Sequence, residues 1–371
     1  MASIITPERL LKLWQDQLLR PSWYLFAANT LAACNQPQEI PKIYHMALKT
    51  ADGKEATLQT ANEAIEQCEK TLKRRAEGSM NAGSVENSNV GLHTSSFSSL
   101  ESMIPSMNNT FKEKLSSGYN AKLIADQSGV TIRMREGLLK GLPICGIPMT
   151  INAINSLNGS IPHYLTTSEA VDAGALAVLS SLVEVRRKSQ KAKLSPQTMA
   201  IKLGPSSINR NFWKSYFQIK EEREDGYRLF NIMSNKKRDK FISMINGASN
   251  ELYKYMINDL HGSLLAFENI LERKETALCI LGSVFPQRVD NMLKNYFRGA
   301  IRNGNSREEI YYARLMGIEI CKWCGVEFDG EVPRYKLLKQ DTKEKDKKLK
   351  KIIKKQNLKV VKKSMIQLNR I

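Results

Sequence analysis

Residues 296–326 read YFRGAIRNGNSREEIYYARLMGIEICKWCGV and carry the clearest local signals for secondary structure in the chain. Gly304 is placed where a left-handed glycine ends a helix, and Ser306 with Glu309 three residues later forms a capping box that begins the next one. Gly299 lies inside the first helix, where its small size lets a neighbouring helix pack closely. The segment therefore predicts two consecutive helices joined by a tight turn.

Helical patterns extend from this segment over most of the chain. At the amino-terminal end, Pro7 suits a first helical turn and is followed by leucines and Trp14 at spacings of three and four residues. Further helices are expected over residues 22–34, 40–50, 59–75, 133–142, 150–157, 168–185, 222–233, 234–256, 260–271, 274–284, 287–303 and 306–326. Strand signals are sparse, since the β-branched run at 130–132 is too short to found a sheet. The expected fold class is all-α.

The composition is that of a large globular chain with a basic carboxyl-terminal tail. The 371 residues are 42% hydrophobic and 25% charged, and 56 Lys and Arg outnumber 37 Asp and Glu. Residues 336–371 hold fourteen basic and three acidic residues, so this tail carries more than half of the net charge of +19. No apolar run is long enough for a transmembrane segment. Six scattered cysteines favour a reducing compartment over a disulfide framework.

The two halves of the chain follow a similar order of helices and glycine stops. In each half, two helices are followed by a third helix that begins with charged residues and ends at a glycine. This glycine is Gly146 in the first half and Gly325 in the second. We therefore expect two related helical modules, separated by polar or basic segments. The expected boundaries are 1–77 and 111–185 for the two parts of the first module, 78–110 for a low-complexity insertion, 186–208 for a basic linker, 209–335 for the second module and 336–371 for a Lys-rich tail.

The segment 296–326 resembles the closing motif of the carboxymuconolactone decarboxylase and alkylhydroperoxidase D-like (AhpD-like) family. In that motif, a helix with the pattern H-x-x-G-A-x-x-x-G precedes S/T-x-E-E-I and a last helix. REGLLKGLPICGIPMTINAINSL at 135–157 is similar to another segment of the family, and FAANTLAACNQPQEIPKIYHMALK at 26–49 is similar to the opening helices of its fungal members. The resemblance implies a divergent AhpD-like helical fold and a homo-oligomer formed through helical faces, and we expect no cofactor.

The resemblance also indicates candidate catalytic residues. Enzymes of the family use a histidine four residues before the alanine of the Gly-Ala pair, and Tyr296 occupies that position here. In the first half the position is Ile43, and His45 is expected on another face of its helix. Both modules therefore lack the family's base. Glu136 and Glu275 are possible acids, and a decarboxylase-like proton-transfer enzyme would use Glu275 with Tyr296.

The peroxidase branch of the family needs a Cys-x-x-Cys pair just before the histidine. In this chain the pair is Cys321 and Cys324, at the end of the last helix of the motif. The lysine between them favours a thiolate, whereas the partial negative charge of a helix carboxyl terminus disfavours it. The pair is expected either to be a displaced redox site or to pack the helix end as small apolar residues. No second Cys or His pair suggests a metal site.

Two classes of function follow from these residues. The first is a non-catalytic scaffold or binding protein that has lost the family's histidine. The second is an enzyme with a displaced active site, either a thiol-dependent peroxidase or oxidoreductase, or a decarboxylase-like enzyme. The chain has neither a P-loop nor a Gly-x-Ser-x-Gly elbow, which argues against those enzyme classes.

The basic tail suggests a further alternative, an RNA-associated protein. Its charge favours contact with phosphates or with an acidic protein partner. The lysines expected to make such contacts are Lys347, Lys348, Lys350, Lys351, Lys354, Lys355, Lys362 and Lys363. The final residues 369–371 share only the basic middle residue of a peroxisomal Ser-Lys-Leu ending. Some fungal relatives of the family that the chain resembles are peroxisomal or mitochondrial, so the peroxisome, the mitochondrion and the cytoplasm are all alternatives for the location.

Overall fold

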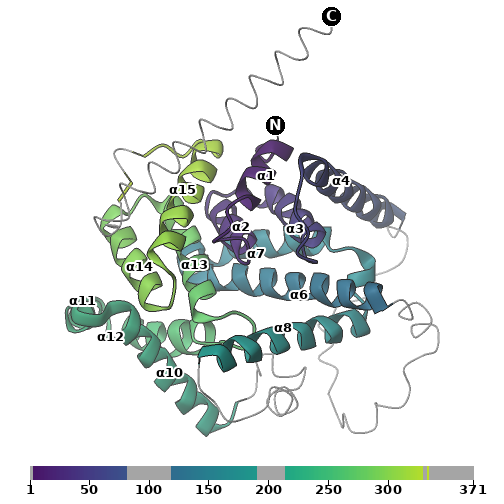
Figure 1. Ribbon diagram of the computed structural model, residues 1–371. Helices are drawn as coiled ribbons and strands as arrows, with labels where there is room; N and C mark the ends of the chain where they lie inside the picture. Colours follow the sequence, from purple (N-terminus) through teal and green to yellow (C-terminus); the bar gives the residue numbers. More distant parts are fainter. Residues whose placement is uncertain (1–2, 82–117, 190–213, 329–331, 334–371) are drawn as a thin grey trace, which may run out of the picture.

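The fold is all-α, as the sequence predicts (Figure 1). The computed structural model describes residues 3–81, 118–189, 214–328 and 332–333, and this part of the chain contains no strand. Its α-helices are α1 Pro7–Trp14, α2 Trp23–Ala33, α3 Ile40–Lys49, α4 Leu58–Asn81, α6 Gly118–Lys140, α7 Leu142–Ser160, α8 Ser168–Ser189, α10 Tyr216–Ser234, α11 Arg238–Ala248, α12 Asn250–Tyr255, α13 Arg273–Val284, α14 Asp290–Arg302 and α15 Arg307–Trp323. Short 3₁₀ turns are η1 Pro37–Glu39, η3 His163–Leu165, η5 Asn235–Lys237 and η7 Phe285–Gln287, and η6 Met256–Leu265 is a π-helix.

Helices α2 and α13 form the centre of the fold. Every residue of α2 is buried, and so is all of α13 beyond its first two residues. A helix that is apolar on all sides requires neighbours on all sides. The two helices approach closely at Gly282, where a Cβ atom would lie 2.7 Å from the carbonyl oxygen of Phe26. Glycine therefore sets the spacing of α2 and α13, because a side chain at this position would push them apart.

One cluster of buried apolar side chains extends from Ile5 to Val332 and includes residues from both expected modules. The order of a helix, a 3₁₀ turn that contains a proline, and another helix occurs twice, as α2, η1, α3 and as α13, η7, α14. The central pair thus takes one helix from each half of the chain. The module boundaries stay a prediction, and among the described residues the two halves share a core.

The structure differs from the expected helices mainly between α10 and α13. The expected helix 234–256 is broken at Ser249, whose backbone is extended and whose hydroxyl accepts the N–H of Leu252 to cap α12. The expected helix 260–271 is instead the end of the π-helix, followed by an irregular segment up to α13. The apolar run at 130–132 lies inside α6.

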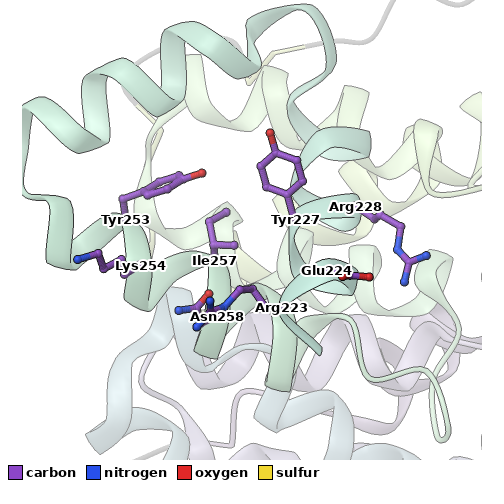
Figure 2. Close-up of a pocket in the computed structure, with 8 residues that line it drawn as sticks. All are labelled: Arg223, Glu224, Tyr227, Arg228, Tyr253, Lys254, Ile257 and Asn258. Carbon is purple, nitrogen blue, oxygen red and sulfur yellow. The ribbon is translucent and has the colours of Figure 1, made fainter. Parts of the chain in front are cut away.

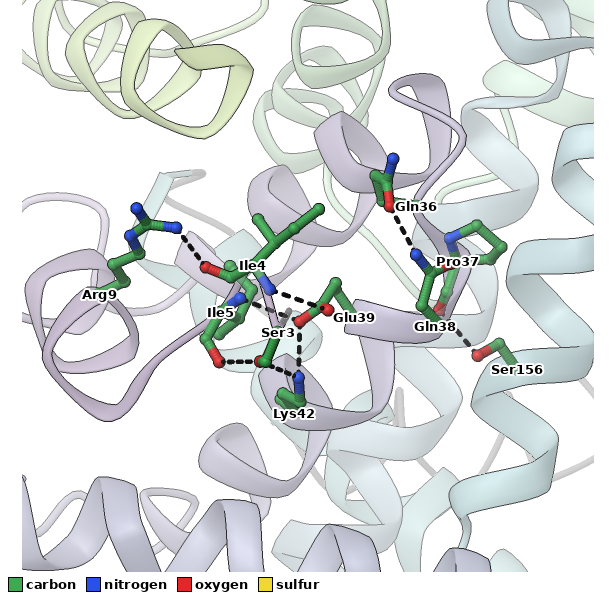
Figure 3. A network of polar contacts seen from close by, with 10 residues as sticks. All are labelled: Ser3, Ile4, Ile5, Arg9, Gln36, Pro37, Gln38, Glu39, Lys42 and Ser156. Atoms are coloured by element: carbon green, nitrogen blue, oxygen red, sulfur yellow. Dashed lines mark hydrogen bonds and ion pairs between the residues drawn. The ribbon is translucent and has the colours of Figure 1, made fainter. Parts of the chain in front are cut away.

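The amino-terminal segment is attached to η1 by the buried carboxylate of Glu39 (Figure 3). This carboxylate accepts the backbone N–H groups of Ile4 at 3.1 Å and Ile5 at 3.0 Å. It also forms an ion pair with Lys42, with 2.8 Å between Nζ and Oε2. Two otherwise unpaired backbone donors are thereby satisfied, which fixes the start of the chain beside α3.

The polar and basic segments expected from the sequence lie largely outside the described residues. Helix α4 extends to Asn81 and α8 to Ser189, so residues 78–81 and 186–189 continue helices rather than begin an insertion or a linker. The remainder of both segments and the whole Lys-rich tail, with the eight lysines expected to bind a partner, are not described. Within the described ranges, no helix has the length and apolarity needed to cross a bilayer.

Candidate functional site

A layer of buried polar side chains joins α2, α6 and α13. The Glu275 carboxylate, 6% exposed, accepts hydrogen bonds from the Ser22 hydroxyl at 3.1 Å and from the Arg133 guanidinium. Its second oxygen accepts the backbone N–H of Glu272 at 3.1 Å and completes the capping box of α13. Burial alone would lower the pKa of Arg133, but the neighbouring charge of Glu275 raises it. Glu275 is therefore engaged on both oxygens as a structural anion.

A second buried ion pair lies further along α6. Glu136 and Lys140 are 2% and 0% exposed, with 3.1 Å between Oε1 and Nζ. Lys140 Nζ also donates hydrogen bonds to the carbonyl oxygens of Leu264, Leu265 and Phe267, the last at 2.8 Å. These carbonyls belong to the end of the π-helix and the residues just after it. Lys140 therefore holds that end of the π-helix against α6.

A pocket of about 320 Å³ lies between α10, α11, the π-helix η6 and α14, and we call it the methionine pocket. Its volume falls within the range of sites for small ligands. The lining side chains are mostly apolar, with a few polar groups among them: Phe230, Met233, Ser234, Phe241, Met244, Ile245, Met256, His261, Met292, Asn295 and Tyr296. Flexible methionine side chains let such a wall adapt to the shape of a ligand.

The π-helix brings His261 to the methionine pocket. Its wide turn is closed by a hydrogen bond of 2.8 Å from the N–H of Ala266 to the carbonyl of His261, five residues earlier. Gly262 packs directly on α10, where a Cβ atom would lie 2.6 Å from the carbonyl oxygen of Glu222. Single π-helical turns inside helices occur frequently at functional sites because they re-aim side chains.

His261 is neutral, and the role of each ring nitrogen is defined. Nδ1 lies 2.9 Å from the carbonyl oxygen of Met256. Since a carbonyl only accepts, Nδ1 carries the hydrogen and Nε2 the lone pair. Burial lowers the pKa of His261, and the hydrogen bond to Met256 offsets this only in part. Phe230 packs edge-on against the imidazole, with ring centroids 5.4 Å apart. The neutral ring thus has one acceptor, Nε2, and lines a mostly apolar pocket.

Tyr296 lines the methionine pocket from α14. Burial raises the pKa of its phenol. The hydroxyl therefore keeps its proton at neutral pH and is able to donate a hydrogen bond. His261, whose Nε2 carries a lone pair, and Tyr296, whose hydroxyl keeps its proton, therefore line the same apolar pocket. This pairing is the combination that acid–base chemistry on a small ligand requires.

The Cys-x-x-Cys pair meets a third thiol. Cys34, at the carboxyl end of α2, lies next to Cys321 and Cys324. The neighbouring Cys321 thiol and burial raise the pKa of Cys34, and the neighbouring Cys34 thiol and burial raise the pKa of Cys324. Because the thiolate is the reactive form, these shifts disfavour nucleophilic reaction of Cys34 and Cys324 at neutral pH, and the redox role of the Cys-x-x-Cys pair stays a prediction. In the described part of the chain, no group of three or more His, Cys, Asp or Glu side chains is arranged to hold a metal ion.

The four predicted catalytic residues lie in three places. Tyr296 lines the methionine pocket, Glu275 is bonded to Arg133 and Ser22 in the buried polar layer, and the cysteines lie at the end of α15. Sequence reasoning missed His261, because it has no cysteine or carboxylate at ligand spacing. The one available signal was the glycine that follows it inside a helical pattern, which marks a close helix contact.

The chain is similar to two curated yeast proteins. It is 26% identical over 339 residues to the Saccharomyces cerevisiae protein named peroxisomal protein 2, a match that spans 90% of this chain and 99% of that protein. A Schizosaccharomyces pombe protein of the same name is 24% identical over 206 residues, which span 54% of this chain and 74% of that protein. No family model matches the chain, and no solved structure matches it.

Proposed function

We propose that the methionine pocket is an acid–base site for a small, largely apolar ligand that carries a carbonyl group. The observation that supports this proposal is the state of His261, whose Nδ1 donates to Met256 while burial keeps the ring neutral. Its Nε2 is then the base, and the hydroxyl of Tyr296 is the donor. The decarboxylase-like alternative from the sequence paired Tyr296 with Glu275. The present proposal retains Tyr296 and pairs it with His261 instead.

The chemistry that fits these two groups is proton transfer at carbon. Nε2 of His261 would accept the proton from a carbon next to the carbonyl, and the phenol of Tyr296 would donate a hydrogen bond to the oxygen that becomes negative. Apolar walls strengthen both interactions because they exclude water from the charges that develop. The Nδ1–H bond to Met256 steadies the imidazole as it becomes positive.

Two observations favour this proposal over the thiol-dependent alternative. The pKa values of Cys34 and Cys324 are raised, so the thiols are weakly reactive at neutral pH. The methionine pocket, in contrast, joins a base and an acid in one volume. The scaffold alternative depends on the Lys-rich tail, which the structure does not describe, and it stays a prediction together with the AhpD-like resemblance and the homo-oligomer.

The names of the two relatives support a peroxisomal location for this chain. The direct test is a fusion of the full chain to a fluorescent protein at its amino terminus, imaged with a peroxisomal marker. Punctate signal that coincides with the marker is expected. A diffuse cytoplasmic signal or a mitochondrial signal would show that the proposed peroxisomal location is wrong.

The chemical test is hydrogen exchange in deuterated water. The full chain is incubated with a panel of small apolar ketones and keto acids, and loss of the α-hydrogen signal is followed by proton NMR. His261→Asn retains a donor for the Met256 carbonyl but removes the base, so exchange should fall by about 100-fold or more. Tyr296→Phe, which removes only the hydroxyl, should lower the rate by about 100-fold.

The exposed His163 supplies the matched control, since His163→Asn makes the same chemical change outside the pocket. Its exchange rate should equal that of the unmodified chain. If the whole panel shows no catalysed exchange, or if His163→Asn lowers the rate as much as His261→Asn, the acid–base proposal is wrong.

A further inference from the structure

A second pocket, of about 590 Å³, is lined by other residues of α10 and the π-helix together with α12, and it has no part in the proposed function (Figure 2). Arg223, Glu224, Tyr227 and Arg228 line it from α10, and Tyr253, Lys254, Ile257 and Asn258 line it from α12 and the π-helix. We call it the tyrosine pocket. Figure 2 shows the phenol rings of Tyr227 and Tyr253 on two sides of the open space, with Ile257 between them.

Close helix packing creates the floor of the tyrosine pocket. At Gly226 a Cβ atom would lie 2.4 Å from the carbonyl oxygen of Ile257 and 2.5 Å from the backbone nitrogen of Gly262. Backbone contact at this point holds α10 and the π-helix in a fixed relation. Ile257 is buried at 5% exposure and forms an apolar floor, whereas the tyrosines on either side retain accessible ring surface.

The two phenols are close enough to influence each other. Burial raises the pKa of Tyr253, with a further contribution from Tyr227. Tyr253 therefore keeps its proton at physiological pH, and both tyrosines present aromatic rings to the pocket. Two aromatic faces above an apolar floor suit a planar ring, which stacks on phenol groups with little loss of side-chain entropy.

The remaining lining residues make the tyrosine pocket positive. The lining includes three basic residues, Arg223, Arg228 and Lys254, and one acidic residue, Glu224. Arg228 forms an ion pair with Asp225 on the same helix, which leaves Arg223 and Lys254, both exposed, as the cations available to a ligand. The side-chain amide of Asn258, which also lines the pocket, adds hydrogen-bonding groups. Such a set binds phosphate oxygens.

We propose that the tyrosine pocket binds a small phosphate-bearing ligand with a planar heteroaromatic ring, of which a purine nucleoside diphosphate is the representative. The ring lies between Tyr227 and Tyr253 over Ile257, and the phosphates contact Arg223 and Lys254. The volume of about 590 Å³ accommodates one nucleotide. Because the tyrosine pocket offers one pair of aromatic rings, it favours a free nucleotide over a nucleic-acid strand, which would need successive stacking platforms.

The test is isothermal titration calorimetry on the full chain with ADP, adenosine and inorganic pyrophosphate. ADP is expected to bind at least about tenfold more tightly than either adenosine or pyrophosphate, because only ADP uses both the rings and the cations. Arg223→Gln/Lys254→Gln should weaken ADP binding by about tenfold or more. Tyr253→Ala should weaken ADP and adenosine alike and leave pyrophosphate unchanged.

The matched control is Lys236→Gln/Lys240→Gln, which removes the same charge from exposed positions of η5 and α11 outside the tyrosine pocket. Since the Lys-rich tail is present in every variant, any nonspecific attraction of phosphate to it is common to all. Circular dichroism confirms that each variant is folded. ADP affinity should be the same in the control and the unmodified chain.

Four outcomes would overturn the proposal. The absence of binding at millimolar ADP would show that the tyrosine pocket takes no nucleotide. Pyrophosphate that binds as tightly as ADP, or a loss of affinity in the control equal to that in Arg223→Gln/Lys254→Gln, would show simple electrostatic attraction. A single-stranded RNA that displaces ADP and binds far more tightly would assign the surface to nucleic acid instead.

Discussion

Replacement of Lys140 by methionine tests how strongly the buried polar layer supports the π-helix. Methionine has a similar length and an apolar end, so it fills most of the same volume without the charge. The substitution leaves the buried carboxylate of Glu136 without its cation and removes the donor from the carbonyls of Leu264, Leu265 and Phe267. Removal of one partner from a buried ion pair typically costs about 3–5 kcal/mol.

The chain provides a control with the same sequence spacing. Lys70 and Glu66 also form an i, i+4 ion pair on a helix, but their side chains are 58% and 63% exposed. Exposed pairs of this kind contribute about 0.3–0.5 kcal/mol. Lys70→Met should therefore lower the free energy of unfolding by less than about 1 kcal/mol, against about 3–5 kcal/mol for Lys140→Met.

Urea unfolding followed by circular dichroism compares the two variants, and amide hydrogen exchange locates the loss. In Lys140→Met the amides of the π-helix should exchange faster than those of the distant α4. The double variant Glu136→Leu/Lys140→Met should recover part of the stability, because it no longer buries a carboxylate that has lost the ammonium group of Lys140. Equal destabilisation by Lys140→Met and Lys70→Met would refute the reasoning, and so would a double variant no more stable than Lys140→Met.

Three further predictions follow from the geometry. Gly282→Ala places a methyl group against the backbone of α2 and should destabilise the chain by about 1–3 kcal/mol. Gly247→Ala, where nothing lies within 4 Å of the new methyl group, should stabilise the chain by about 0.5–1 kcal/mol. The midpoint of thermal unfolding should therefore fall in the first variant and rise in the second. Burial lowers the pKa of His45 from 6.5 to about 4, so this residue contributes stability that is present above pH 6.5 and is lost as the pH falls toward 4. The free energy of unfolding should decrease by up to about 3 kcal/mol as the pH is lowered across that range. In His45→Asn this pH-dependent decrease should be smaller. Cys34 and Cys324 should react slowly with a thiol reagent at neutral pH in the folded chain and rapidly after denaturation, and fast reaction in both states would restore the redox alternative.

The sequence predicts those parts of the fold that depend on local backbone chemistry. Ser306 and Glu309 form the expected capping box, with the Glu309 N–H 3.0 Å from the serine oxygen and the Ser306 N–H bonded to the glutamate. Gly304 has a φ angle of +105°, as a residue beyond a helix end requires. These features involve residues a few positions apart, so they are encoded within one segment. The helix α15 accordingly begins where the pattern indicates.

The candidate site is not encoded within one segment. His261 becomes a site residue only because the π-helix shifts its register and because α14 brings Tyr296 to the same volume. Both effects depend on contacts between residues distant in sequence, such as Lys140 with the end of the π-helix. Helical periodicity assumes a turn of 3.6 residues, so it places side chains of a π-helix on the wrong face. Cys34 was missed for the same reason, since it meets Cys321 and Cys324 only when the two halves of the chain pack together.

The π-helix links the two pockets, which leads to a final prediction. Met256 and His261 line the methionine pocket, while Ile257 and Asn258 line the tyrosine pocket from the same turns. A change at the end of this helix therefore alters both sites at once. Lys140→Met, which lies in neither pocket, should weaken ADP binding and slow ligand hydrogen exchange together, whereas Lys70→Met should affect neither. Loss of only one of the two readouts would show that the pockets are supported independently and that the π-helix does not couple them.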